Sequence, residues 1–196
     1  MGFRTVNAFL SVITLCLAAA LCAAPAHASS QREDVDLRCA LLAALDDAAS
    51  FTDRFEAEVW LLDMAGRLAK RVPDTEQRMQ LLKLIHREAT RVDLPPELVL
   101  AVIEVESNFD PWAISVAGAQ GLMQVMPFWL AELGRPEDSL HHPPTNLRFG
   151  CTILRHYLDI EKGDLKRALA RYNGSLGRSE YPERVLRALR ERWYRQ

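Results

Sequence analysis

An ionisable side chain on the apolar face of a predicted helix is the feature that most constrains this chain. Pro95-Pro96 can open a helix, because proline suits a first turn whose N–H groups lack internal partners. A run of mostly aliphatic residues follows as far as Glu106. The helical repeat puts Val99, Ile103 and Glu106 on one stripe. A carboxyl group therefore continues an apolar face, close to where the helix should end.

The position of Glu106 predicts a raised pKa. Burial disfavours the carboxylate, and so does the negative end of the helix dipole. Both effects suit a general acid that works near neutral pH. Glu104 lies two residues earlier, about 200° round the helix, and is predicted to face water. The helix alone leaves a plainer alternative open, in which Glu106 only ends a helix at a polar surface.

Three motifs occur in a fixed order along the chain. Glu106-Ser107 comes first, then the block of residues 115–127 with its Gly-Leu-Met-Gln-Val-Met-Pro end, and then the pair Tyr172-Asn173. This ordered set resembles the lytic transglycosylases of the soluble (SLT) type, and the likeness covers roughly residues 85–190. The resemblance implies a mostly α fold: a lysozyme-like SLT domain with an N-terminal helical extension.

The chain is predicted to divide into a signal peptide at residues 1–28, a helical extension at 29–84 and the SLT domain at 85–196. Arg4, an apolar run over residues 9–24 and small residues at 26 and 28 are typical of a cleaved export signal. The run is short for a membrane span, with an uncleaved anchor as the alternative. Leucine precedes Cys16 and Cys22, which disfavours a lipid anchor. We expect a periplasmic protein without a transmembrane segment after cleavage.

The charge of the chain argues against nucleic acid as a partner. The formal net charge is −2, and loss of Arg4 with the signal makes it −3. The chain therefore lacks the excess of positive charge that nucleic-acid binding requires. Residues 184–195 are locally basic, but leucines and a tryptophan alternate with the arginines at helical spacing. The pattern favours an amphipathic helix with a solvated basic face over a contact with anionic cell-wall polymer.

Two cysteines remain after cleavage, Cys39 and Cys151. Exported proteins meet oxidising conditions, so a disulfide between the two is predicted. Cys151 also continues an apolar helical series, which suits a buried free thiol equally well.

The apolar periodicity predicts helices throughout the rest of the chain. They are expected over residues 33–49, 122–133, 146–160, 165–172 and 181–194. A further helix is capped by Thr52 or Asp53 and ends near Pro73, another starts at Asp74 and carries apolar residues as far as Ala89, and the helix of Glu106 opens at Pro95-Pro96. The helix over 122–133 is interrupted or entered at Pro127. Residues 108–120 should form a loop with short extended pairing.

The resemblance also implies a mechanism. Glycosidic cleavage usually needs a proton donor and a second carboxylate, yet no Asp or Glu lies between Asp110 and Glu132. Lytic transglycosylases use one glutamate as acid and then base, while the 6-hydroxyl of the substrate attacks the anomeric carbon. The resemblance therefore implies that Glu106 catalyses the cleavage of peptidoglycan strands, and that the products carry 1,6-anhydro-N-acetylmuramyl ends. The alternatives are a muramidase that admits water and a non-catalytic glycan-binding or secretion-assembly protein.

The resemblance carries substrate-binding roles over to five further positions. Ser115 would reach the N-acetyl group of the sugar, and Gln124 and Met126 would line the groove. Tyr172 matches the aromatic residue whose hydroxyl lies near the catalytic glutamate, and Asn173 is its partner. Plainer alternatives are a loop or cap role for Ser115 and core roles for Met126 and Tyr172.

A few residues depart from the family or invite other functions. Arg171 stands where alanine is common, so it either alters the groove edge or points into solvent. His141-His142 has no third ligand at a recognisable spacing, so no metal site is predicted. No cofactor is expected either. Trp112 and Trp129 are candidates to flank the groove.

Overall fold

The computed structural model of the protein describes residues 54–133 and 135–194, with side chains from Trp60 onward. Its helices are α2 (Arg54–Leu68), α3 (Thr75–Arg91), α4 (Pro96–Glu106), α5 (Phe128–Glu132), α6 (Pro143–Ile160), α7 (Leu165–Tyr172), α8 (Glu180–Ala188) and the π-helix η1 (Leu189–Trp193). Extended pairing in the described residues consists of two isolated bridges, Ile114 with Gln120 and Gln120 with Val125. The predicted mostly α class is confirmed.

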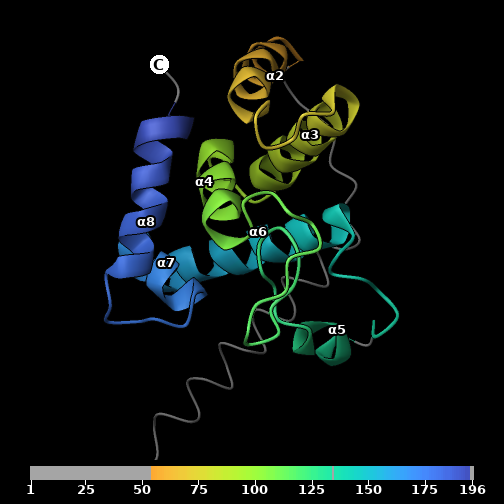
Figure 1. Ribbon diagram of the computed structural model, residues 1–196. Coiled ribbons are helices and arrows are strands. Elements are labelled where there is room, and N and C mark those ends of the chain that lie inside the picture. Colours follow the sequence, from red (N-terminus) through yellow and green to blue (C-terminus); the bar gives the residue numbers. More distant parts are fainter. Residues whose placement is uncertain (1–53, 134, 195–196) are drawn as a thin grey trace, which may run out of the picture. The chain divides into compact units, whose positions relative to one another are not determined.

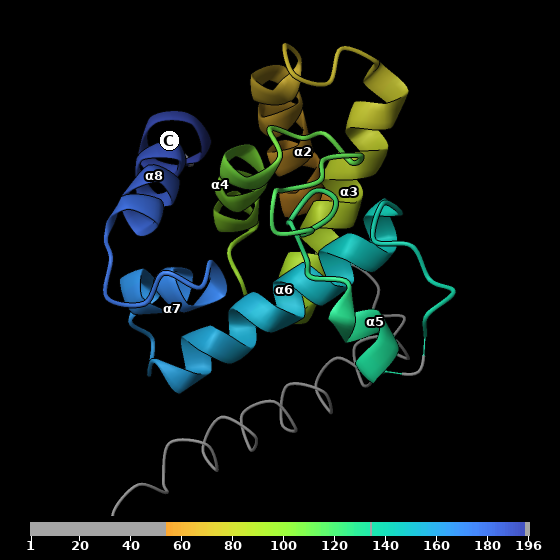
Figure 2. The same cartoon turned by 60° about the horizontal axis from the view of Figure 1, so that its bottom comes forward.

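Helix α4 is the central element of the described chain. Pro96 opens it, and residues 98–103 are all buried, as an apolar helix of this kind requires. It packs against α3, α8 and η1. Figure 1 and Figure 2 both show α4 between α8 on one side and the α2–α3 pair on the other. Neighbours on both sides explain why α4 has hardly any solvated face.

Helix α6 crosses below α4 and joins α3 to α7. It begins at Pro143, three residues before the predicted start, because two prolines occupy its first turn. Glu88 of α3 is fully buried and accepts hydrogen bonds from Arg91 and from Arg148 of α6. Burial alone would raise the pKa of Glu88, but the two guanidinium groups hold this pKa below its usual value. The ion pair between Glu88 and Arg148 holds α3 against α6.

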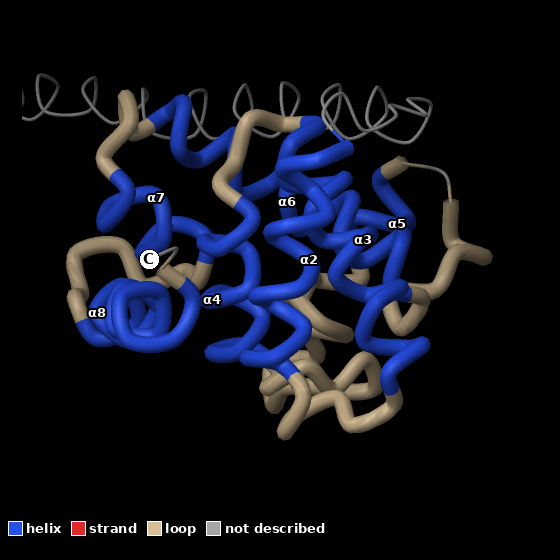
Figure 3. Tube along the Cα trace, turned by 90° about the horizontal axis from the view of Figure 1, so that it is seen from above, coloured by secondary structure: helices blue, strands red, loops and turns tan. Residues whose placement is uncertain are grey.

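The segment between α4 and α5 forms a compact loop, drawn in tan in Figure 3. Of the helix predicted over residues 122–133, the entry at Pro127 is confirmed, since Pro127 is the N-cap of α5, whereas residues 122–126 are not helical. Gln124 has φ +50° and Gly121 has φ +75°, conformations that break a right-handed helix. The loop also shows the short extended pairing that the sequence predicted.

Some expectations concern residues outside the described ones: the signal peptide, the helix over 33–49 and Cys39. Asp74 caps α3 as predicted, because its carboxylate accepts a hydrogen bond from Gln77 N at 2.7 Å. None of the described helices combines the length and apolar character needed to cross a membrane. Cys151 is fully buried and forms no disulfide with a described residue, and its Sγ lies 3.9 Å from Met123 Sδ. Its pairing with Cys39 stays an untested prediction.

Candidate active site

Glu106 is the last residue of α4 and is only partly exposed. Burial raises the pKa of its carboxyl group to about 7, against opposing contributions from Tyr181 and Arg184. The direction agrees with the sequence prediction. A carboxyl group with this pKa is protonated in an appreciable fraction of molecules at neutral pH, so it can donate a proton there.

Tyr181 of α8 holds the carboxyl group of Glu106. Its hydroxyl donates a 2.7 Å hydrogen bond to Oε1 of Glu106, and its side chain is buried. Burial and the neighbouring Glu106 carboxylate keep the pKa of Tyr181 well above 10, so the hydroxyl stays a donor. The motifs of the sequence do not include Tyr181. Its spacing from Val185 and Ala188 marks a buried helical face, but that pattern does not reveal which group the hydroxyl meets.

Arg184 lies one turn further along α8, beside the same carboxyl group. Its Nη2 donates to the carbonyl oxygen of Val105 at 3.3 Å. The positive charge favours the ionised form of Glu106 and so lowers its pKa. Tyr181 and Arg184 thus offset part of the burial effect, which places the pKa near neutrality instead of higher.

The prediction that Glu104 faces water is wrong. Only 10% of its side chain is exposed, and its carboxylate forms ion pairs with Arg71 at 2.9 Å and Arg192 at 2.6 Å. Trp193 Nε1 donates to it at 2.7 Å as well. The wide turn of η1 brings Arg192 and Trp193 over this side of α4, which a helix taken by itself would leave in solvent.

The serine of the Glu-Ser pair connects α4 to the following loop. Ser107 Oγ donates to Leu122 O at 2.8 Å and approaches Ile103 O at 3.2 Å. The residue that follows the acid therefore fixes the loop that carries the other motif residues.

Three of the predicted binding residues lie in this loop. Ser115 is exposed, and its Oγ accepts a hydrogen bond from Ala119 N at 3.0 Å. Gln124 Nε2 donates to the carbonyl oxygens of Ala113 and Gly121, so its side chain braces the loop. Met126 is 36% exposed. Ser115 thus braces the loop internally, while Met126 lies at the surface.

The predicted Tyr172-Asn173 pair ends α7. The Tyr172 hydroxyl donates to Met123 O at 2.7 Å, whereas the hydroxyl that donates to Glu106 belongs to Tyr181. Burial raises the pKa of Tyr172, and the Glu106 carboxylate adds to the effect. Asn173 is the exposed C-cap of α7.

The remaining candidates divide between surface and core. Trp112 is 71% exposed and stacks on His141, with ring centroids 5.4 Å apart, whereas Trp129 is buried. Arg171 folds back onto Glu161 in a 2.6 Å ion pair. Among the residues that the structure describes, no group of three or more His, Cys, Asp or Glu side chains is arranged to hold a metal ion.

Within the described part of the chain, the groups that shift the pKa of Glu106 are a phenol and a guanidinium. A second carboxylate is not among them.

Comparisons with known proteins show the family of the chain. The transglycosylase SLT domain family matches residues 83–189. A transglycosylase of Enterobacteria phage PRD1 is 32% identical over 116 residues, which are 56% of this chain and 43% of the relative. Membrane-bound lytic murein transglycosylase C of Haemophilus ducreyi is 37% identical over 91 residues, 40% of this chain and 25% of the relative. The chain thus spans less than half the length of these curated relatives. Matched over more than half of its own length, it belongs to the transglycosylase SLT domain family.

Proposed function

We propose that the chain is a lytic transglycosylase that cleaves the β-1,4 bond between N-acetylmuramic acid and N-acetylglucosamine in peptidoglycan. The observation that carries the proposal is the carboxyl group of Glu106, with its pKa of about 7 and its partner Tyr181. The names of two relatives, transglycosylase and lytic murein transglycosylase, support the same class of reaction.

One glutamate suffices for the reaction. Glu106 donates its proton to the glycosidic oxygen as the bond from that oxygen to the anomeric carbon breaks. The resulting carboxylate takes the proton from the 6-hydroxyl of the muramyl sugar as that oxygen bonds to the anomeric carbon. The product is a 1,6-anhydro-N-acetylmuramyl end, Glu106 regains its proton, and water is not consumed.

The loop after α4 and the end of α7 form the proposed groove. Ser115 reaches the N-acetyl group of the sugar, and Gln124 and Met126 line the groove. Tyr172 and Asn173 border the groove at α7. The exposure of Ser115, Met126 and Asn173 supports these roles, since a side chain that meets substrate has to be accessible.

The proposal extends to location and domain order. Residues 1–28 are a cleaved export signal, residues 29–84 are a helical extension and residues 85–196 are the catalytic domain. The protein acts in the periplasm, where its substrate lies. Fractionation of cells, with N-terminal sequencing of the exported form, tests this part.

Purified sacculi provide the test of the reaction. Wild-type protein should release muropeptides with 1,6-anhydro ends, which are one water lighter than the reducing ends of a muramidase product. Glu106→Gln should lower the release rate about 10²–10⁴-fold, because the amide keeps the shape but donates no proton to the leaving oxygen.

Glu132→Gln is the matched control for this experiment. Glu132 is an exposed carboxylate at the end of α5, so its removal should leave the rate unchanged. A product dominated by reducing ends would identify a hydrolase. Near wild-type release by Glu106→Gln would remove Glu106 from the mechanism.

A further inference from the structure

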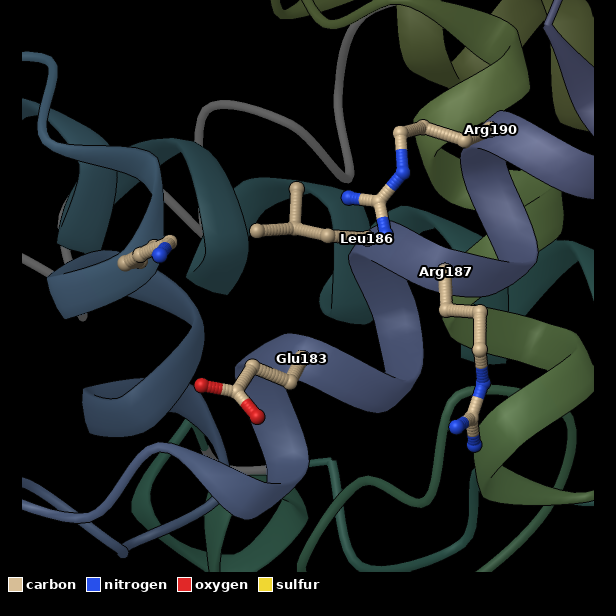
Figure 4. A pocket seen from close by; sticks show the side chains of 5 residues that line it. Glu183, Leu186, Arg187 and Arg190 are labelled. Carbon is tan, nitrogen blue, oxygen red and sulfur yellow. The ribbon is translucent and has the colours of Figure 1, made fainter.

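A hollow of about 350 Å³ lies between α7 and α8. Its lining consists of Lys166, Glu183, Leu186, Arg187 and Arg190. Figure 4 shows Glu183 and Arg187 pointing apart, although they are four residues apart on one helix. The volume is at the small end of the range that ligand sites occupy. It would accommodate part of a peptide.

The hollow carries an excess of positive charge. Three of its lining residues are cations and one is an anion. Nearby arginines are satisfied within the protein: Arg167 and Arg171 both pair with Glu161. Within the described part of the chain, Arg187 and Arg190 have no carboxylate partner. Their guanidinium groups are therefore available to an external anion.

Helix α8 carries residues of the hollow and also residues beside the catalytic glutamate. Arg184 contacts Val105 O, next to Glu106, and Arg187 and Arg190 follow at intervals of three residues. With a rise of 1.5 Å per residue, Arg190 lies about 9 Å along the helix from Arg184. Arg184 lies beside Glu106, whereas Arg187 and Arg190 lie further along the helix, in the hollow that Lys166 of α7 also lines. The row of arginines therefore extends away from the active site.

We propose that this hollow binds the acidic peptide stem of the muramyl residue whose bond is cleaved at Glu106. The inference rests on the proposed function, because that activity supplies a glycan whose muramyl sugars carry short peptides with several carboxylates. Three extended residues span about 10 Å, which is comparable to the rise of about 9 Å along the helix between Arg184 and Arg190. Guanidinium groups pair with carboxylates through two parallel hydrogen bonds. Glu183 takes the free amino group that a diamino acid in the stem presents.

The test compares two soluble substrates that differ only in their peptides. One is a glycan strand with its stems, and the other is the same strand after removal of the stems by an amidase. The double variant Arg187→Gln/Arg190→Gln should raise KM about 5–20-fold on the first substrate, since each exposed pair is worth a factor of a few. Its kcat on that substrate and both constants on the bare strand should stay at wild-type values.

Two further measurements sharpen the result. Lys70→Gln/Lys83→Gln removes the same charge from exposed positions on and near α2 and α3, and should change neither constant. About 0.5 M salt should abolish the effect of the arginine variant, because screening removes contacts between exposed charges. An equal rise of KM on both substrates, or no rise on the strand with stems, would overturn the proposal.

Binding separates this inference from the proposed reaction. A tetrasaccharide with stems, titrated into the Glu106→Gln protein, should bind about 5–20-fold more weakly when Arg187 and Arg190 are also replaced by glutamine. If the wild-type protein released no muropeptides with 1,6-anhydro ends from sacculi, the proposed function would be refuted. Unchanged affinity in this titration would refute the stem site alone.

Discussion

Tyr181 and Glu106 are 75 residues apart in sequence and are joined by a 2.7 Å hydrogen bond. The bond runs from a buried phenol on α8 to the carboxyl group that ends α4. It favours the ionised carboxylate, while burial favours the neutral acid. The pKa of about 7 is the balance of these effects, so the acid is adjusted by a residue outside the three motifs.

Tyr181→Phe should shift this balance. Loss of the hydrogen bond raises the pKa of Glu106 above 7, because a group that stabilised the carboxylate is removed. The high-pH limb of kcat/KM should move to higher pH, and kcat should fall roughly tenfold as the carboxyl group loses its orientation. The measurement is the pH dependence of muropeptide release.

Tyr172→Phe is the matched control. Its hydroxyl bonds to Met123 O and not to Glu106, so the variant should lose stability and keep the position of the pH limb. If both variants move the limb equally, the assignment of Tyr181 as the partner of Glu106 is wrong.

Glu106 should make the protein less stable as the pH rises. Its carboxyl pKa is raised from 4.5 to about 7 on folding, so the folded state binds a proton more tightly than the unfolded state between these values. The free energy of unfolding therefore falls through this window as pH increases. Glu106→Gln should exceed the wild type by about 1–3 kcal/mol at pH 8 and match it below pH 4.5.

Urea unfolding of both proteins at about pH 4, 6 and 8 measures this difference across the window in which the linked proton is lost. A gain that is constant across the three values would show that the glutamine side chain packs better, and that titration of Glu106 has no part in it. A loss at the highest pH would contradict the raised pKa itself.

Glu104 should be a stability residue. Glu104→Gln leaves Arg71 and Arg192 without their carboxylate, in a site where only 10% of the glutamate side chain is exposed. We expect a loss of about 1–3 kcal/mol in the free energy of unfolding. The rate per folded molecule should change little. Glu137→Gln, at an exposed position, is the control and should leave the unfolding midpoint unchanged.

The contrast between Glu104 and Glu106 shows how far the sequence could lead. Local periodicity placed Glu106 on an apolar face and predicted the direction of its pKa shift correctly. The same geometry put Glu104 in solvent, because a single helix carries no information on what η1 and Arg71 later cover. Tyr181 was missed for the same reason: its partner comes from a contact between helices far apart in sequence.

Helix boundaries show the same division between local and long-range causes. Asp74 and the prolines before α4 are local signals, and both helices begin where these signals predict. The helix predicted over 122–133 is entered at Pro127, and its first residues are not helical because Asn146 of α6 holds residues 120–123 in a turn, through bonds to Met123 N and Gln120 O. Apolar composition alone could not reveal that clamp.

Asn146 should accordingly control the loop that carries the proposed groove. Its side chain is fully buried, accepts from Met123 N at 2.7 Å and donates to Gln120 O and Leu140 O at 2.8 Å. Asn146→Ala leaves three backbone groups without this partner and should cost about 2–4 kcal/mol of unfolding free energy. Because Gln124 and Met126 follow directly, KM for glycan strands should also rise.

The control for this last variant is Asn173→Ala, at the exposed end of α7. It removes an amide without unpairing buried groups, so the free energy of unfolding should change by less than about 0.5 kcal/mol. Asn146→Asp separates the two halves of the clamp: the acceptor for Met123 N remains, while both donated bonds are lost. A stability loss for Asn146→Asp close to that of Asn146→Ala would assign the clamp to Gln120 O and Leu140 O. A wild-type unfolding curve for Asn146→Ala would show that the loop holds its turn without the clamp.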